Sequence, residues 1–307
     1  MNDVQIFEVS PRDGLQNEAT FVATEDKVAH IERLVAAGVK DIEVTSFVRP
    51  RWIPALADAE AVVERLPMVE GVRYWGLVPN QRGFDRARSS GISNICTFLS
   101  SSETHNAKNV NRTINESVSA VSRVIRSAAD EGLGVRAYIS TVFGCPYEGD
   151  VSVEAPLRIA QSMFDAGADV VVLGDTTGMA LPEQVRRVLG QFADAGVDLG
   201  RVALHAHDTR GTALVNVFAA YQAGIRRFDG SVGGIGGCPY APGASGNAAT
   251  EDLVYLFHGL GLSTGVGLDE LAATATEMEA LLGRALPGRF LAWWKGQRNS
   301  DAKCESA

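Results

Sequence analysis

Short apolar segments alternate along the chain with segments in which apolar residues recur every three or four positions. The first pattern predicts buried strands and the second predicts amphipathic helices. Strands are expected at 5–10, 41–47, 73–79, 94–99, 135–143, 170–174, 202–206 and 227–232. Helices are expected at 24–38, 55–66, 82–90, 114–132, 154–167, 182–196, 212–224 and 249–260, with one more at about 268–286.

Eight strand–helix pairs in about 257 residues predict an α/β protein, a (β/α)8 TIM barrel with an appended C-terminal helical segment. The run at 170–174 is continuously apolar, as expected of a parallel strand buried on both faces. A doubly wound open sheet is the alternative that this periodicity leaves open. We expect one catalytic domain over residues 1–290 and a polar, frayed tail over 291–307.

Glycine is abundant, at 32 of 307 residues, against a usual share of about 7%. Six glycines follow predicted helices, where a left-handed residue releases the chain into the next strand: Gly38, Gly91, Gly132, Gly167, Gly196 and Gly224. A further cluster within 230–246 requires a different explanation.

The composition is that of a globular protein, with 46% hydrophobic and 21% charged residues, and excludes disordered and fibrous chains. The net charge of −9 disfavours nucleic acid and acidic membranes as partners but not a small anion bound by local cations. The four cysteines form no CxxC pair, which indicates free thiols in a reducing compartment. Without a signal peptide or a long apolar run, we expect a cytoplasmic protein.

Polar residues at the carboxyl ends of barrel strands are candidates for chemistry. His205 and His207 end the seventh predicted strand and, being two apart, point to the same face. The pair fits half of a metal site as well as it fits two hydrogen-bonded core histidines. Asp13 and Asn247 follow the first and eighth strands, which are neighbours in a closed barrel. Nitrogen and oxygen donors of these types suit Mg²⁺ or Mn²⁺.

Glu43 interrupts an apolar strand, and a buried charge needs a partner. Arg12 on the neighbouring strand is the expected partner, and in a barrel mouth it can stabilise an enolate or carboxylate oxygen. Asp175 fits either a residue that orients a metal ligand or a simple turn aspartate. The glycine-rich loop at 233–247 fits no phosphate-binding pattern. It is expected to be a mobile lid, with Cys238 either a proton donor or an ordinary small loop residue.

The chain closely resembles the 3-hydroxy-3-methylglutaryl-CoA (HMG-CoA) lyase family of TIM-barrel metallolyases, from about residue 5 to 290. The resemblance lies in EVSPRDGLQNE (8–18), DIEVTSF (41–47), GCPYEG (144–149), LGDTTG (173–178), HAHDTRG (205–211) and GGIGGCPYAPGASGNAATEDLVYLFHGLG (233–261). Condensing relatives such as isopropylmalate and homocitrate synthases share the RDGxQ and HxH motifs. The loop that contains Cys238 is more specific to the lyases.

The resemblance implies four ligands for a divalent cation, Mg²⁺ or Mn²⁺: Asp13, His205, His207 and Asn247. It implies catalytic or supporting roles for four further residues: Arg12, Cys238, Glu43 and Asp175. The implied substrate is an acyl-CoA, for which the candidate cations on strand-end loops are Arg49, Lys108 and Arg112. Each of these three also fits a solvated surface residue. A homodimer, leucine degradation and ketone-body formation are implied by family analogy alone.

The implied reaction is a retro-Claisen cleavage of HMG-CoA to acetyl-CoA and acetoacetate. A base, either His205 or Asp175, removes the proton of the C3 hydroxyl, which is bound at the cation with the C5 carboxylate. Arg12 then holds the acetyl-CoA enolate, and Cys238 protonates it.

Departures from the family pattern leave the acyl group open. Arg49 and Arg51 stand where Ser and Lys are common, His105 where Phe is common, and Arg210 where Tyr is common. The alternatives are a lyase for citramalyl-CoA or for a longer 3-substituted 3-hydroxyglutaryl-CoA. A condensing synthase or aldolase on the same barrel is less favoured, and a non-enzymatic binding barrel has no need of the strand-end residues.

Overall fold

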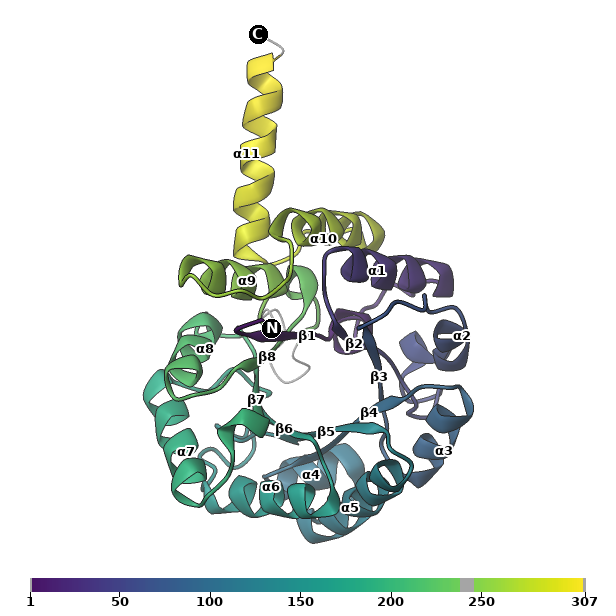
Figure 1. Ribbon diagram of the computed structural model, residues 1–307, viewed down its shortest axis with the longest axis vertical. Helices are drawn as coiled ribbons and strands as arrows, with labels where there is room; N and C mark the ends of the chain where they lie inside the picture. Colours follow the sequence, from purple (N-terminus) through teal and green to yellow (C-terminus); the bar gives the residue numbers. More distant parts are fainter. Residues whose placement is uncertain (1, 238–245, 306–307) are drawn as a thin grey trace.

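The computed structural model describes the backbone of residues 2–237 and 246–305 and the side chains of residues 2–237 and 246–298. Eight parallel strands pair in sequence order, and β1 also pairs with β8, which closes the barrel. The helices surround the strands (Figure 1). The predicted TIM barrel is confirmed and the open sheet is excluded, because the two end strands are hydrogen-bonded to each other.

The strands are β1 (Gln5–Glu8), β2 (Asp41–Ser46), β3 (Arg73–Leu77), β4 (Asn94–Ser100), β5 (Gly134–Ser140), β6 (Val170–Asp175), β7 (Val202–Ala206) and β8 (Arg227–Gly230). The α-helices are α1 (Thr24–Ala36), α2 (Ala59–Glu64), α3 (Gln81–Ser89), α4 (Glu103–Val110), α5 (Ile114–Asp130), α6 (Glu154–Ala166), α7 (Pro182–Asp194), α8 (Ala213–Gln222), α9 (Thr250–Gly259), α10 (Leu268–Leu282) and α11 (Arg289–Glu305). Four short turns are η1 (Ser10–Gly14), η2 (Pro54–Leu56), η3 (Leu199–Arg201) and η4 (Val232–Gly234).

All six glycines predicted to release helices into strands have positive φ angles, between 74° and 111°. Gly38 has a second reason to lack a side chain. A Cβ at this position would lie 2.3 Å from the carbonyl oxygen of Gly265. The end of α1 therefore approaches the segment before α10 more closely than any other residue type permits.

Helix α4 was not predicted, because its eight residues are mostly polar and show no apolar period. Local capping accounts for it instead. The Ser102 hydroxyl accepts a hydrogen bond from the backbone N–H of His105, and Asn111 ends the helix in a left-handed conformation. The helix follows β4 directly and so stands at the carboxyl end of the barrel.

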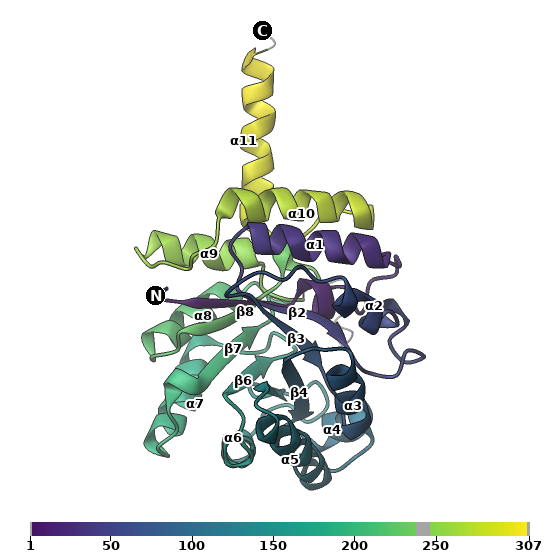
Figure 2. The ribbon, with the colours of Figure 1, turned by 45° about the vertical axis from the view of Figure 1, so that its right-hand side comes forward.

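The predicted frayed tail at 291–307 is wrong as far as Glu305, because α11 covers Arg289–Glu305. Leu291 and Trp294 are buried, and the Trp294 indole donates a hydrogen bond to Asp269 on α10. These two anchors hold the first turns of α11, and the helix then extends away from the barrel (Figure 2). Because the two buried apolar residues that anchor α11 lie at one end of the helix, the apolar pattern is too short to predict it.

The barrel interior contains both apolar and charged side chains. Its apolar members are Phe7, Val9, Trp75, Leu77, Cys96, Tyr138, Val172 and Ala203. Glu43, Arg136 and Asp229 are buried on β2, β5 and β8. Since unpaired buried charges are costly, their partners define the chemistry inside the barrel. Among the described residues, no helix combines the length and the apolarity that crossing a membrane requires.

Candidate active site

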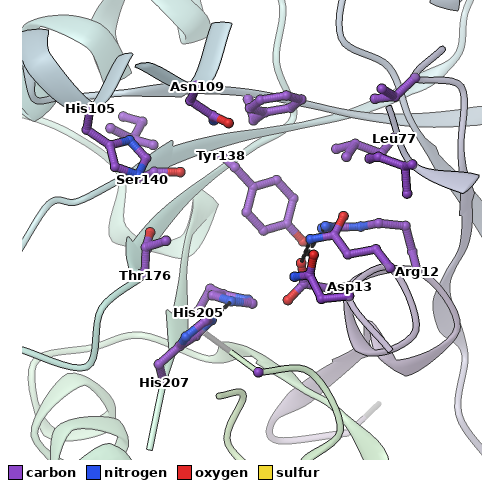
Figure 3. A pocket seen from close by; sticks show the side chains of 18 residues that line it. Arg12, Asp13, Leu77, His105, Asn109, Tyr138, Ser140, Thr176, His205 and His207 are labelled. Atoms are coloured by element: carbon purple, nitrogen blue, oxygen red, sulfur yellow. Dashed lines mark hydrogen bonds and ion pairs between the residues drawn. The ribbon is translucent and has the colours of Figure 1, made fainter. Parts of the chain in front are cut away.

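A cavity of about 310 Å³ opens at the carboxyl ends of the strands. Side chains from several strands and from α4 point into it (Figure 3). Its polar lining comprises Arg12, Asp13, Gln16, Asn17, His105, Asn109, Tyr138, Ser140, Thr176, His205 and His207. Apolar residues, among them Val48, Ile53, Leu77 and Phe98, complete the wall.

A π-helical turn follows β1 and presents two consecutive residues to this cavity. In this turn, η1, the carbonyl oxygen of Val9 accepts hydrogen bonds from the backbone N–H groups of Asp13 (2.8 Å) and Gly14 (3.2 Å). Turns of this kind are rare and concentrate at functional sites. Behind the turn, Ser10 is held by the Glu8 carboxylate and by His30, each at 2.8 Å. Arg12 and Asp13 therefore enter the pocket from a rigid backbone.

Arg12 and Glu43 form the buried ion pair that the sequence predicts. The Arg12 Nε donates to Glu43 Oε2 at 2.7 Å, and Nη1 donates to Asp13 Oδ1 at 2.5 Å. Burial opposes the charge of the guanidinium, but the two carboxylates outweigh it and raise the pKa of Arg12 above its ordinary value. Arg12 is thus a permanent cation, fixed on two sides, at the wall of the pocket.

The four predicted metal ligands converge beside Arg12. The ligand atoms of Asp13, His205 and His207 all lie within 4.8 Å of one another. The two Nε2 atoms of the histidines face each other at 3.0 Å. Asn247 pairs with His207 through an isolated β-bridge and donates to Asp13 Oδ2 at 2.9 Å, while its Oδ1 is buried without a hydrogen-bond partner among the described residues.

The protonation states of Asp13 and His207 suit metal binding. Burial would raise the pKa of Asp13, but Arg12 and the two imidazoles lower it to about 2. Burial is the main cause that lowers the pKa of His207 to about 3. An ionised carboxylate and a neutral imidazole are the forms that ligate metals. The inward-facing nitrogens and the unpartnered Asn247 oxygen therefore fit a hard or borderline divalent cation.

Sequence reasoning missed a buried group beneath His205, formed by Asp229, Arg136 and Tyr138. The His205 Nδ1 lies 3.3 Å from Asp229 Oδ2. Asp229 also accepts hydrogen bonds from Arg136 (2.5 Å) and from the Tyr138 hydroxyl (2.8 Å). The signal was present, since Arg136 and Asp229 interrupt predicted strands just as Glu43 does.

Asp175 stands apart from the pocket wall. Its Oδ1 accepts hydrogen bonds from the backbone N–H groups of Met179 (2.8 Å) and Ala180 (3.2 Å). The neighbouring residues Gly174 and Thr176 line the cavity. The Oδ2 of Asp175 is buried without a hydrogen-bond partner among the described residues, and burial raises the pKa of Asp175 to about 6 although the nearby His205 lowers it. This geometry fits both interpretations that the sequence left open, a turn aspartate and a residue that acts on the site.

The three cations predicted for CoA are exposed on the rim of the barrel. The Arg49 guanidinium lies 5.6 Å from the Trp52 ring centroid, and the Lys108 Nζ lies 4.4 Å from that of Tyr147. Arg112 follows α4, and its carbonyl oxygen accepts a hydrogen bond from Asn106. Cys238 lies outside the described residues, directly after Gly237, which lines the cavity.

Two departures from the family pattern differ in their relation to the pocket. His105 lines the cavity from α4, as does Asn109 one turn later. Arg210 instead donates to the carbonyl oxygens of Thr177 (2.8 Å) and Gly178 (3.0 Å), which ties the loop after β7 to the loop after β6. Of these two departures, the one on α4 is therefore the one that changes the lining of the cavity.

Comparison with known proteins places these features in context. The HMGL-like family model matches residues 3–278. Hydroxymethylglutaryl-CoA lyase YngG of Bacillus subtilis is 50% identical over 292 residues, covering 95% of this chain and 97% of its own. An (R)-citramalyl-CoA lyase of Chloroflexus aurantiacus is 44% identical over 298 residues, covering 94% of this chain and 93% of its own.

Solved structures agree with the sequence comparison. A crystal structure of the Bacillus subtilis HMG-CoA lyase has a TM-score of 0.94 and 49% identity, covering 96% of this chain and 99% of its own. An HMG-CoA lyase from Acinetobacter baumannii, solved in complex with coenzyme A and 3-methylmalate, has a TM-score of 0.88 and 39% identity. It covers 93% of each chain.

Proposed function

Because the chain belongs to the HMGL-like family, we propose that its pocket cleaves HMG-CoA to acetyl-CoA and acetoacetate. The protein is a carbon–carbon lyase of the HMG-CoA lyase type. The observation that carries the reaction is the convergence of Asp13, His205 and His207 beside the buried guanidinium of Arg12. An acyl-CoA substrate is supported by the coenzyme A bound to the related enzyme.

The divalent cation, Mg²⁺ or Mn²⁺, would be held by Asp13, His205, His207 and the carbonyl oxygen of Asn247. When bound, such a cation lowers the pKa of a coordinated hydroxyl and neutralises a substrate carboxylate. The choice of ligands rests on the inward-facing nitrogens and on the buried, unpartnered Asn247 Oδ1.

The reaction is a retro-Claisen cleavage. The C3 hydroxyl loses its proton, the oxygen electrons form the new carbonyl of acetoacetate, and the C2–C3 bond breaks. The bonding pair moves to C2 and yields the enolate of acetyl-CoA, which takes up a proton at C2. The protein must therefore supply a base, a cation for the enolate oxygen and an acid.

Arg12 is assigned to the enolate oxygen. Its guanidinium lines the pocket and is held by Glu43 and Asp13 before any substrate arrives. A fixed cation costs no reorganisation when charge develops, which makes electrostatic stabilisation effective. Glu43 contributes by orienting Arg12, and it has no need to touch the substrate.

The proposed base and the proposed acid rest on different kinds of evidence. Of the two candidate bases, His205 is also a proposed metal ligand and its Nδ1 faces Asp229, so neither ring nitrogen is free to take a proton. Asp175 is therefore the proposed base. One of its carboxylate oxygens holds the loop after β6, and the other is buried without a hydrogen-bond partner among the described residues. Cys238 remains the proposed proton donor on the strength of the sequence resemblance, with Gly237 before it at the pocket wall.

Arg49, Lys108 and Arg112 are proposed to attract the phosphates of CoA. Their support is their position after β2 and β4, at the mouth end of the barrel: Arg49 and Arg112 lie on loops, and Lys108 lies in the last turn of α4. Exposed cations of this kind act through local attraction, which salt screens.

A second function, the cleavage of citramalyl-CoA, is favoured by the 44% identical Chloroflexus aurantiacus relative and by His105 and Asn109 on the α4 wall. The two substrates differ by one methylene between C3 and the free carboxylate, which is worth about 10–200-fold in discrimination. Citramalyl-CoA would give pyruvate in place of acetoacetate.

The test is a substrate panel on the purified protein. HMG-CoA, citramalyl-CoA and longer 3-hydroxy-3-substituted glutaryl-CoA esters are compared by kcat/KM, with acetoacetate and pyruvate assayed separately. HMG-CoA is expected to have the highest kcat/KM. Chelation is expected to abolish cleavage, and Mg²⁺ or Mn²⁺ to restore it. A higher kcat/KM for citramalyl-CoA would replace HMG-CoA cleavage by citramalyl-CoA cleavage as the proposed function. Full activity in metal-free protein would contradict both functions as metal-dependent reactions.

A homodimer is also proposed. Tyr255 and Trp293 are exposed aromatic residues near the base of α11, as expected of a surface that receives a partner. Light scattering after size-exclusion chromatography is expected to give twice the mass of the 32.6 kDa chain. The cytoplasmic location and the metabolic pathway stay predictions from the sequence.

A further inference from the structure

Asp229 is a carboxylate on the inner face of β8, fully enclosed by the barrel. Its side chain has no exposed surface, and its side-chain hydrogen bonds within the described part of the chain are to residues of β5 and β7. Oδ1 accepts a hydrogen bond from Arg136 at 2.5 Å, and Oδ2 accepts one from the Tyr138 hydroxyl at 2.8 Å. None of these three residues has a role in the chemistry assigned above.

The third contact of Asp229 connects this group to the metal cluster. His205 Nδ1 lies 3.3 Å from Asp229 Oδ2, and a carboxylate can only accept a hydrogen bond. The imidazole proton therefore belongs on Nδ1. The lone pair of Nε2 then faces His207 and Asp13, where a ligand lone pair is required.

Arg136 and Tyr138 fix the carboxylate that makes this contact. The Arg136 guanidinium lies 3.8 Å from the Phe7 ring centroid and is buried, so its charge is neutralised by Asp229 in place of water. Tyr138 lines the pocket with its ring while its hydroxyl is directed at Asp229. Because Arg136 donates to one carboxylate oxygen and Tyr138 to the other, the orientation of the Asp229 carboxylate toward His205 is fixed.

We propose that Asp229, held by Arg136 and Tyr138, is the positioning residue that keeps His205 in the tautomer able to ligate the metal. The proposal rests on the proposed metal-dependent function and deepens it. It follows the general design in which a ligating histidine donates its second N–H to a carboxylate.

Asp229→Asn gives a directional test, because Arg136 is a donor and must face the amide oxygen. The amide NH₂ then faces His205, whose Nδ1 has to accept, so the proton moves to Nε2 and blocks the ligand position. An aspartate-to-asparagine change of this kind behind a histidine is known to reverse its tautomer. The matched control is Asp41→Asn, a buried aspartate of β2 bonded to Trp75 and Arg73 at the other end of the barrel.

Two measurements that do not depend on activity are made on each variant. The first is the Mn²⁺ dissociation constant, by electron paramagnetic resonance of free Mn²⁺. The second is the tautomer of His205 in metal-free protein at pH 8, from the ¹⁵N shifts of its imidazole. Asp229→Asn is expected to weaken Mn²⁺ binding about 10–100-fold and to move the His205 proton to Nε2. Asp41→Asn is expected to change neither.

The outcomes separate this proposal from the proposed function. Failure of the wild-type protein to bind Mn²⁺ contradicts the metal-dependent function. Normal Mn²⁺ binding and an unchanged tautomer in Asp229→Asn overturn the positioning role while the function stands. Weaker Mn²⁺ binding with an unchanged His205 tautomer also overturns the positioning role. In that case the uncompensated charge of Arg136 is enough to explain the loss of affinity.

Tyr138→Phe provides the answer if Asp229→Asn does not fold, because it removes one hydrogen bond and keeps the ring. It is expected to weaken Mn²⁺ binding about 2–10-fold, less than direct loss of the carboxylate that accepts the histidine proton, and to broaden the His205 Nδ1 signal. Unchanged affinity and an unchanged spectrum contradict the proposal.

Discussion

The floor of the pocket and its rim use charge in opposite ways. On the floor, Arg12, Asp13 and Glu43 are packed into one another, with two short contacts from a single guanidinium. On the rim, Arg49 and Lys108 are exposed and rest on the faces of aromatic rings. Each charged side chain of the floor is held in one conformation by its partners. The exposed charged side chains of the rim can adopt many conformations.

The difference follows from the role proposed for each region, bond cleavage on the floor and CoA binding on the rim. Bond cleavage needs charge at a fixed point, and a preorganised cation supplies that without rearrangement. The phosphates of CoA need only a favourable field, and flexible side chains in water provide it at small entropic cost. Substitutions on the floor are therefore expected to change kcat, and those on the rim to change KM.

The largest effect is expected for Arg12→Met, with a loss of about 10³-fold in kcat. Removal of one oxyanion donor costs about 10²–10³-fold, and here a full charge is lost. Glu43 would also be left buried without its partner, which destabilises a protein by about 3–5 kcal/mol.

Steady-state kinetics and thermal unfolding of Arg12→Met and of Arg12→Met/Glu43→Gln separate the two consequences. The double variant is expected to regain melting temperature but not kcat. Recovery of activity in the double variant would show that Arg12 acts through stability alone, and the distinction between floor and rim would fail.

Cys238→Ala is expected to lose about 10²-fold in kcat, within the range of about 10²–10⁴-fold for a general acid. Cys96→Ala is the matched control, since Cys96 is fully buried on the inner face of β4. It is expected to lower the melting temperature through the cavity it leaves and to keep kcat within about twofold of wild type. Equal, small losses of kcat in both variants would remove Cys238 from catalysis.

On the rim, Lys108→Ala is expected to raise KM about 2–5-fold at low salt, consistent with the small worth of an exposed ionic contact, and to leave kcat unchanged. The difference from wild type should vanish near 0.5 M salt because screening removes the attraction. Lys40→Ala, an exposed lysine just before β2 at the opposite end of the barrel, is the control. A change in kcat would place Lys108 with the floor residues.

The smallest effect on catalysis is expected for Glu251→Gln, behind the floor. Burial, with the nearby Asp252, raises the pKa of Glu251 to about 8, and its carboxyl accepts a hydrogen bond from the Gly233 N–H. A folded-state pKa above the unfolded value means that the folded state binds the proton more tightly. The free energy of unfolding therefore falls as pH rises from about 4.5 to 8.

Glutamine has no proton to lose, so melting temperature in Glu251→Gln should depend less on pH across that window, with the variant more stable than wild type at pH 8.5. Its kcat at pH 7 should match that of wild type. Parallel melting curves against pH for the two proteins would contradict the elevated pKa.

Much of the floor could be predicted, because buried charges obey strict rules. Glu43 inside an apolar strand demanded a cation, and Arg12 is that cation. Applied to Arg136 and Asp229, the same reasoning finds the second pair.

The α4 wall and α11 could not be predicted, for a different reason. Helix α4 is mostly polar and depends on its end caps, and α11 is apolar only in its first turns, which tertiary contacts hold. His105 and Asn109 reach the pocket only because α4 forms. The region proposed to distinguish between acyl groups is therefore the one for which sequence periodicity is least informative.

The pairing of β1 with β8 has a consequence for the order of events in the cell. Asn247 and Asp13, in contact at 2.9 Å, are 234 residues apart. A ribosome that adds about 5–20 residues per second takes about 12–47 s between them. Throughout this interval the emerging Arg12 and Asp13 lack the strand that completes their surroundings. The proposed cation site is thus complete only once the last segments of the barrel are made, and a cation bound there would in turn favour the closed seam.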